Sequence, residues 1–275
     1  MPGPGFNAGL TPRFPSPPPR ASGPQDAFTD EAGVRTPVGQ TVRVTPLVEE
    51  GEVVAQGAPV ACLRDTPGVR FVAPMPGRVA RIALLPGRKL SEIVLYRETG
   101  GDVVGHDISA ADTGDGLRGL IQAAGLWPWL RRRPFGGMPP HDERPAALVV
   151  MAADSRPLAP DPRRALVGRE AAFARGLGAL ASLTDGPVFV CQQPGPALFE
   201  RGLAGGRVRV SVCGSRHPQG SPGIRIHDLA PAAIEAPVWD VHAADVAAQG
   251  KMQETGGAPL RRRARLRDAA RRESR

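Results

Sequence analysis

Apolar positions follow two different patterns in the two halves of the chain. In the first half, short apolar runs such as residues 42–44, 69–74 and 79–82 are interrupted by glycine. The glycines at these breaks are Gly51, Gly57, Gly68, Gly77 and Gly87. Short runs bounded by glycine are typical of brief β-strands joined by turns. Residues 33–99 are therefore predicted to form a β module.

The second half has longer apolar stretches. Residues 146–153 form an unbroken apolar run, which is typical of a strand buried on both faces. Residues 161–162, Asp-Pro, predict a helix start, and an apolar stripe follows at Leu166, Phe173, Leu177 and Leu180. Strands are expected at residues 188–190 and 208–212, with a brief helix at 196–203 between them. Alternation of strand and helix predicts a Rossmann-like parallel α/β domain over residues 125–256.

A polar, glycine-rich segment joins the two halves. Residues 100–124 are expected to form a linker and a short helix that begins near Asp115. Gly125 is predicted to end this helix, because glycine readily adopts the left-handed conformation found after helix ends. Trp127 and Trp129 then lie just beyond the helix.

The two ends of the chain differ in composition from its body. Residues 1–32 are rich in proline and are expected to form an extended arm, either free or wrapped on a partner. Residues 257–275 form an arginine-rich tail. The net charge is +8, but residues 260–275 alone contribute +6. The nearly neutral body argues against a nucleic-acid-binding face.

The sequence lacks the motifs of several classes of catalytic site. Cys62, Cys191 and Cys213 are widely spaced without a CxxC pair, and no HExxH occurs, so neither a zinc site nor an iron–sulfur cluster is expected. GxSxG and GxxxxGK[ST] are also missing, which argues against a serine esterase and a phosphate-binding P-loop. Neither catalytic nor metal-binding residues are predicted. No apolar segment is long enough to cross a membrane.

The β module resembles the barrel-sandwich hybrid fold of lipoyl and biotinyl carrier domains. The resemblance lies in an acidic turn, a VxxG-like step and the Ala-Pro-x-x-Gly-x-Val return at residues 73–79. Carrier domains present a modifiable lysine at a hairpin tip. Here the tip, residues 63–68, reads Leu-Arg-Asp-Thr-Pro-Gly, and arginine cannot replace the primary amine. An unmodified structural module is expected.

A set of motifs resembles the family of the large peripheral subunit, NqrA, of the Na+-translocating NADH:quinone reductase. The matching strings are Gly-Leu-Trp at 125–127, Arg-x-Arg-Pro-Phe at 131–135, Pro-Ala-Ala at 145–147, residues 153–162, and His-Pro-x-Gly-x-Pro-Gly at 217–223. The likeness covers residues 33–256. It stops at Gly256, where the family continues with a further β-rich domain. The tail is therefore interpreted as frameshifted or truncated sequence, with a genuine basic tail that binds acidic lipid or nucleic acid as the alternative.

The resemblance implies a peripheral subunit on the cytoplasmic face of the bacterial inner membrane. The complex would couple NADH oxidation and quinone reduction to sodium export, with ubiquinone as substrate. NADH, the flavins and the iron–sulfur cluster would lie on partner subunits, and this chain would bind no cofactor. The alternatives are a non-enzymatic adaptor with a lipoyl-like module, an inactive truncated subunit, and a relative in Rnf-type complexes, whose cluster-binding cysteine motifs are missing here.

Aromatic and arginine residues near the long apolar run are the best ligand candidates. The set proposed to lie near quinone is Trp127, Trp129, Arg131, Arg133 and Phe135. A quinone headgroup is a flat ring with two carbonyl acceptors, which aromatic walls and a guanidinium donor would suit. The alternative is that the tryptophans fill an interdomain core. His217 is a further loop candidate, with a structural role as its alternative.

Overall fold

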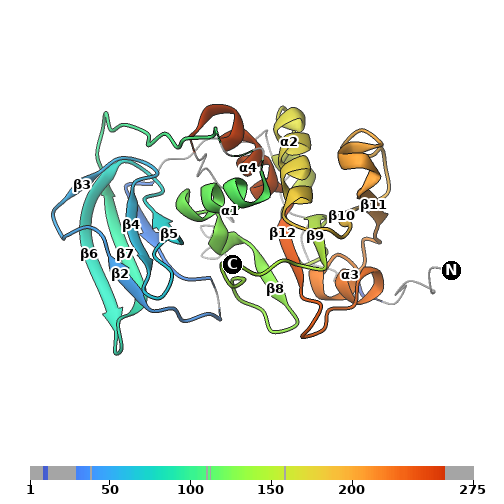
Figure 1. Cartoon of the computed structure of the whole chain (residues 1–275), viewed down its shortest axis with the longest axis horizontal. Coiled ribbons are helices and arrows are strands. Elements are labelled where there is room, and N and C mark those ends of the chain that lie inside the picture. Colours follow the sequence, from blue (N-terminus) through green and yellow to red (C-terminus); the bar gives the residue numbers. More distant parts are fainter. Residues whose placement is uncertain are drawn as a thin grey trace, which may run out of the picture.

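A computed structural model gives the fold of the 275-residue chain. The structure describes residues 9–11, 29–37, 39–109, 111, 113–157 and 159–257. An antiparallel β module and an α/β domain lie next to each other, with α1 (Gly114–Ala123) between them (Figure 1). Most of the proline-rich arm and the tail beyond Gly257 lie outside the described residues.

The β module consists of two antiparallel sheets. Their orders are β1-β7-β6-β3 and β2-β4-β5. The strands are β1 (Glu31–Val34), β2 (Val44–Pro46), β3 (Val53–Val54), β4 (Pro59–Leu63), β5 (Arg70–Val72), β6 (Gly77–Leu85) and β7 (Lys89–Arg97). Buried residues of both sheets, among them Val60, Phe71, Ile93 and Leu95, share one apolar core. The prediction of a β module is confirmed.

The second domain is built on a mostly parallel sheet of order β11-β10-β9-β12-β8. Its strands are β8 (Arg131–Arg133), β9 (Ala147–Ala152), β10 (Val188–Gln192), β11 (Val208–Val212) and β12 (Val238–His242). Only the short β8 is antiparallel to its neighbour, β12. The parallel part begins in the middle at β9, adds β10 and β11 on one side, and then crosses back to place β12 on the other.

Helices cover both faces of this sheet, as Figure 1 shows. α2 (Glu170–Ser182) and α4 (Ala243–Thr255) lie on one face, and α3 (Pro222–Leu229) lies on the other. All six residues of β9 are buried, and they alternate between the two layers. Leu148 and Val150 pack with α2 and α4, while Val149 packs with α3. This two-sided burial explains why the strand is continuously apolar.

Glycine allows α2 and α4 to pack closely. A Cβ atom added at Gly176 of α2 would lie 2.2 Å from the carbonyl oxygen of Val246 in α4. One added at Gly250 of α4 would lie 1.8 Å from the carbonyl oxygen of Ala172 in α2. Both distances are far below a permitted contact, so the helix crossing depends on glycine at both positions.

Some predicted helices differ in the structure. The brief helix expected at 196–203 is wrong: this segment is a loop held by Gln192, whose Nε2 donates to the Pro196 carbonyl. Only a 3-10 turn, η3 (Leu203–Gly206), follows. Clustered proline and glycine prevent a regular helix there.

The long helix predicted after Asp161 is divided. Asp161 caps a 3-10 turn, η2 (Pro162–Ala165), through its side chain. Gly168, with φ of +73°, separates this turn from α2. The predicted end of α1 is confirmed, because Gly125 has φ of +71° and a 3-10 turn, η1 (Trp127–Trp129), follows it.

The β module and the α/β domain are packed together. Val69 of the β module is fully buried in the same apolar cluster as Trp127. Across the boundary, the Met138 amide donates to Gln40 Oε1 at 2.9 Å. The first part of the linker is bound to both domains: Val104 N donates to the carbonyl of Gln56 in the β module at 2.8 Å, and His106 N donates to the carbonyl of Gly256 after α4 at 2.7 Å.

Candidate functional site

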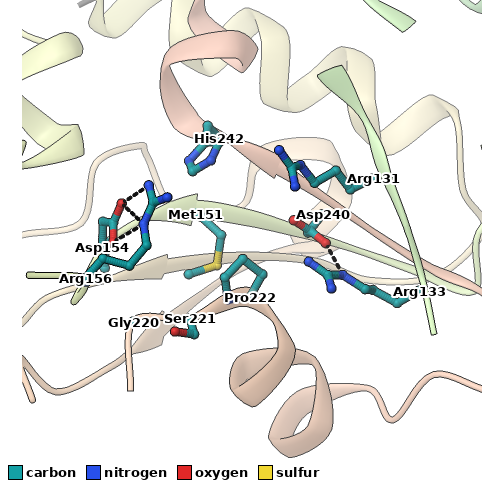
Figure 2. Close-up of a pocket in the computed structure, with 11 residues that line it drawn as sticks. Arg131, Arg133, Met151, Asp154, Arg156, Gly220, Ser221, Pro222, Asp240 and His242 are labelled. Atoms are coloured by element: carbon teal, nitrogen blue, oxygen red, sulfur yellow. Dashed lines mark hydrogen bonds and ion pairs between the residues drawn. The ribbon is translucent and has the colours of Figure 1, made fainter. Parts of the chain in front are cut away.

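A cavity of about 150 Å³ opens at the carboxyl ends of β9 and β12. These neighbouring strands flank the point where the chain changes direction across the sheet. Open α/β sheets bind ligands at this point, because the connections leave the two strands in opposite directions and open a crevice. Figure 2 shows the cavity. Its lining residues are Arg131, Arg133, Met151, Ala153, Asp154, Arg156, Gly220, Ser221, Pro222, Asp240 and His242.

Two ion pairs form opposite sides of the cavity. Asp154, just after β9, accepts from the Arg156 amide at 2.9 Å and from its Nη2 at 2.6 Å. On β12, Asp240 accepts from Arg133 Nε at 2.7 Å. Burial works to raise the pKa of Asp154, but the hydrogen bonds and charge of Arg156 outweigh it and leave the pKa below its ordinary value. Both carboxylates are therefore already paired.

Arg131 is the cavity arginine without an ion-pair partner among the described residues. It lies on β8, whose antiparallel pairing with β12 sets Arg131 opposite Asp240. In Figure 2 its guanidinium points toward the side of the cavity where His242 lies. Because two carboxylates face three guanidinium groups, the lining has one positive charge in excess when His242 is neutral.

The loop before α3 is fixed against the end of β9. The Gly220 amide donates to Ser155 Oγ at 2.9 Å, and His217 Nδ1 lies 3.4 Å from the same oxygen. A Cβ atom at Gly220 would lie 2.7 Å from the Ser155 amide nitrogen, so the loop can approach this closely only with glycine. Leu10 also exchanges two backbone hydrogen bonds with His217. His217 thus helps to fix a loop that borders the cavity, but its side chain does not line the cavity.

The structure separates the five residues predicted to lie near quinone. Arg131 and Arg133 meet at the cavity. Trp127 is completely buried: its Nε1 donates to the Pro139 carbonyl at 3.0 Å. Trp129 is half-buried and lines a different, very small space. Phe135 is 69% exposed on the surface.

An aromatic core supports the strand that carries Arg131. The rings of Trp127 and Trp239 lie 5.4 Å apart at 81°, an edge-to-face contact. Trp239 Nε1 donates to Glu143 Oε1 at 2.8 Å, and Arg132 Nε donates to the other oxygen of the same carboxylate at 2.5 Å. Glu143 therefore links β12 to β8 through side-chain hydrogen bonds, in addition to the backbone hydrogen bonds between the two strands.

Sequence reasoning missed several of the residues that line the cavity. Asp240 and His242 lie in β12, and Ser221 and Pro222 lie at the start of α3; the sequence pattern marks none of these four as a site residue. Asp154 has the sequence context of a turn residue, and its bond to the Arg156 amide has that geometry. The carboxyl-end rule for parallel strands would group Asp154 with His242 once β12 is placed beside β9.

The described residues bring together no group of three histidine, cysteine or acidic side chains suited to a metal ion. Cys191 and Cys213 are buried near α3. Burial raises the pKa of the Cys191 thiol to about 12, so it stays protonated. The chemistry available at the cavity is ion pairing and hydrogen bonding by arginine, histidine and serine.

The fold and the cavity define a class of protein: a β module joined to an α/β domain with a cavity where the strand order of its sheet reverses. Over residues 113–258 the chain matches the family described as the NqrA second alpha/beta domain. The chain therefore belongs to the NqrA family of the Na+-translocating NADH-quinone reductase.

Curated relatives carry the corresponding name. The NqrA protein of the Na(+)-translocating NADH-quinone reductase from Alcanivorax borkumensis is 34% identical over 248 residues, which are 86% of this chain and 55% of that protein. The protein of the same name from Shewanella amazonensis is 33% identical over 86% of this chain and 54% of its own length. The one from Klebsiella pneumoniae strain 342 is 37% identical over 77% and 48%. The chain spans about half the length of the curated relatives it matches.

Proposed function

We propose that this chain acts as a peripheral subunit of a sodium-pumping NADH:quinone oxidoreductase, which couples NADH oxidation and quinone reduction to Na+ export. The observation that supports the proposal is the similarity to relatives of that name along most of the chain. The other subunits of the complex are its partners, and they carry NADH, the flavins and the iron–sulfur cluster. Ubiquinone is the substrate of the whole complex.

The β module is proposed to be a structural barrel-sandwich hybrid, and the second domain a Rossmann-like scaffold. The turn between β4 and β5 is closed by a hydrogen bond from the Leu63 amide to the Val69 carbonyl. It contains no lysine, so no lipoyl or biotinyl group can be attached there. The role proposed for this module is to support assembly of the chain with the other subunits.

The chain is proposed to lie on the cytoplasmic face of the bacterial inner membrane, held there by its partner subunits. Among the described helices, none combines the length and the apolar character that a membrane span requires. Contact with the membrane subunits then depends on side chains at the surface.

The surface beside β8 is proposed to face quinone or the partner that binds it. Phe135 is exposed at this surface, and the Arg132 guanidinium lies 5.7 Å from the centre of its ring. Arg131 lies on the same strand. Trp127 supports the surface from the core. A cavity of about 150 Å³ is smaller than the roughly 300–1,000 Å³ of ordinary ligand pockets, so a quinone ring would need a wall from a partner protein.

Co-expression of the tagged chain with the other reductase subunits tests the assembly. We expect the flavin-containing subunits to co-purify and the complex to reduce quinone with NADH. Recovery of the chain only as a lone monomer, with no gain in reductase activity, would contradict the proposal and favour an adaptor.

A photoreactive quinone tests the proposed surface on the assembled complex. Phe135→Ala should weaken labelling of this chain. Val167→Ala is the control, because Val167 is an apolar residue of similar exposure, 70%, in the turn between η2 and α2. Equal labelling of the two variants would remove Phe135 from the quinone-facing surface without affecting the assembly proposal.

A further inference from the structure

The cavity at the sheet reversal has an uncompensated positive charge. Asp154 and Asp240 each accept hydrogen bonds from an arginine of their own side of the cavity. Arg131 has no such partner among the described residues, and His242 lines the same cavity. A guanidinium has five hydrogen-bond donors that match the two oxygens of a carboxylate or the oxygens of a phosphate. The charge and the donors both favour an anion.

The size of the cavity limits the anion. An engineered cavity of about 150 Å³ in another protein holds benzene, a ring of six heavy atoms. The cavity here has about the same volume. A nucleotide is too large for it, and the site fits a ligand of roughly six heavy atoms.

The lining favours one negative charge and a short apolar group. The two aspartates inside the cavity repel a second charge on a ligand, so a dianion such as phosphate is disfavoured. Met151 and Pro222 provide apolar surface near the centre of the group in Figure 2. A carboxylate head on Arg131 would leave a short aliphatic chain against these two residues.

The start of α3 adds polar contacts to the same space. Ser221 is its N-cap residue, yet its side chain makes no capping hydrogen bond. Ser221 lines the cavity and lies beside Gly220 in Figure 2. Gly223, in the first turn, would meet nothing within 4 Å if it carried a Cβ atom, so the space beside this residue is open. The helix end thus strengthens a site that the arginine and the cavity define.

We propose that this cavity binds a small organic monocarboxylate, with Arg131 pairing the carboxylate and Met151 and Pro222 contacting the aliphatic part. This goes beyond the role in the reductase complex and does not depend on it. A ligand of six heavy atoms is expected to bind with Kd on the order of 1 mM.

Binding is measured on the purified full chain by ligand-observed nuclear magnetic resonance at low ionic strength, with butyrate as probe. Wild type should bind butyrate saturably and more tightly than acetate, which lacks the longer aliphatic chain. Arg131→Gln should weaken binding by about tenfold to hundredfold, as expected for the loss of one charged hydrogen-bonding partner. Arg209→Gln is the matched control, since Arg209 is an exposed arginine on β11, at the opposite edge of the same sheet.

A second variant acts without a change of charge. Ser221→Phe should fill the cavity from α3 and abolish butyrate binding, while the urea midpoint of unfolding checks that each variant is folded. If Arg131→Gln does not fold, Ser221→Phe alone decides the question.

Three results would overturn the proposal. The first is that butyrate shows no saturable binding at 20-fold above the expected Kd of ~1 mM. The second is that Arg131→Gln and Arg209→Gln weaken butyrate binding equally. The third is that inorganic phosphate binds more tightly than butyrate. None of these bears on assembly with the reductase subunits, so the two proposals fail separately.

Discussion

Two glycines of α2 should respond in opposite ways to the same substitution. Gly176 faces α4, where an added Cβ atom would lie 2.2 Å from a carbonyl oxygen, whereas Gly178 would meet nothing within 4 Å. Replacement of a helical glycine by alanine contributes roughly 1 kcal/mol through helix propensity. Gly178→Ala should therefore stabilise the domain by about 1 kcal/mol.

Gly176→Ala gains the same propensity but must push the two helices apart. The atom contacted is backbone, which cannot rotate away as a side chain can, so the cost falls near the upper end of overpacking, about 3 kcal/mol. The net result is a destabilisation of about 2 kcal/mol. The two variants should thus differ by about 3 kcal/mol, or about 1.5 M urea for an m-value of about 2 kcal/mol/M.

Urea unfolding followed by tryptophan fluorescence measures this difference. All three tryptophans, at positions 127, 129 and 239, lie in or beside the α/β domain, so the signal reports on the layer that contains α2. If Gly176→Ala unfolds at the same urea concentration as Gly178→Ala, the close helix crossing is not a source of stability and the argument is refuted.

Three further predictions concern buried groups. Trp127→Phe should lower the free energy of unfolding by about 2 kcal/mol, because it leaves the buried Pro139 carbonyl without its donor; urea titration measures this, and an unchanged midpoint would contradict it. Asp154→Asn should be less stable than wild type at pH 7. The depressed pKa of Asp154 means that its contribution is present above the ordinary carboxyl pKa of about 3.9 and is lost as the pH falls through the lower folded value, so the two urea midpoints should converge in acid. Cys191 should resist iodoacetamide at pH 8 in the native chain and react fully in urea, because burial holds its pKa at about 12; mass spectrometry detects the adduct, and native labelling would refute this.

Strong local patterns make much of the fold predictable. β9 is recognisable because burial on both faces requires an unbroken apolar run, and the end of α1 is recognisable because Gly125 suits the turn there. The helix predicted at 196–203 is wrong because proline and glycine spacing outweighs the apolar pair Leu198 and Phe199. Short-range patterns therefore locate elements well where burial is complete.

The candidate site is less predictable because it depends on sheet order. Arg131 is a candidate from sequence, but its neighbours in space, Asp240 and His242, are more than a hundred residues away in the chain. Their proximity follows from β12 pairing beside β9, which no local pattern specifies. Trp127 is predicted either as a ligand contact or as part of an interdomain core, and its full burial beside the ring of Trp239 agrees with the second prediction.

The attachment of the linker to both the β module and the α/β domain has a mechanical consequence. Carrier domains work by travelling between sites on a loose tether, whereas this β module is fixed to its neighbour through Val69, Gln40 and the bonds of Val104 and His106. A load applied to either part would turn both together. A partner that binds the β module would therefore also set the orientation of the cavity in the α/β domain.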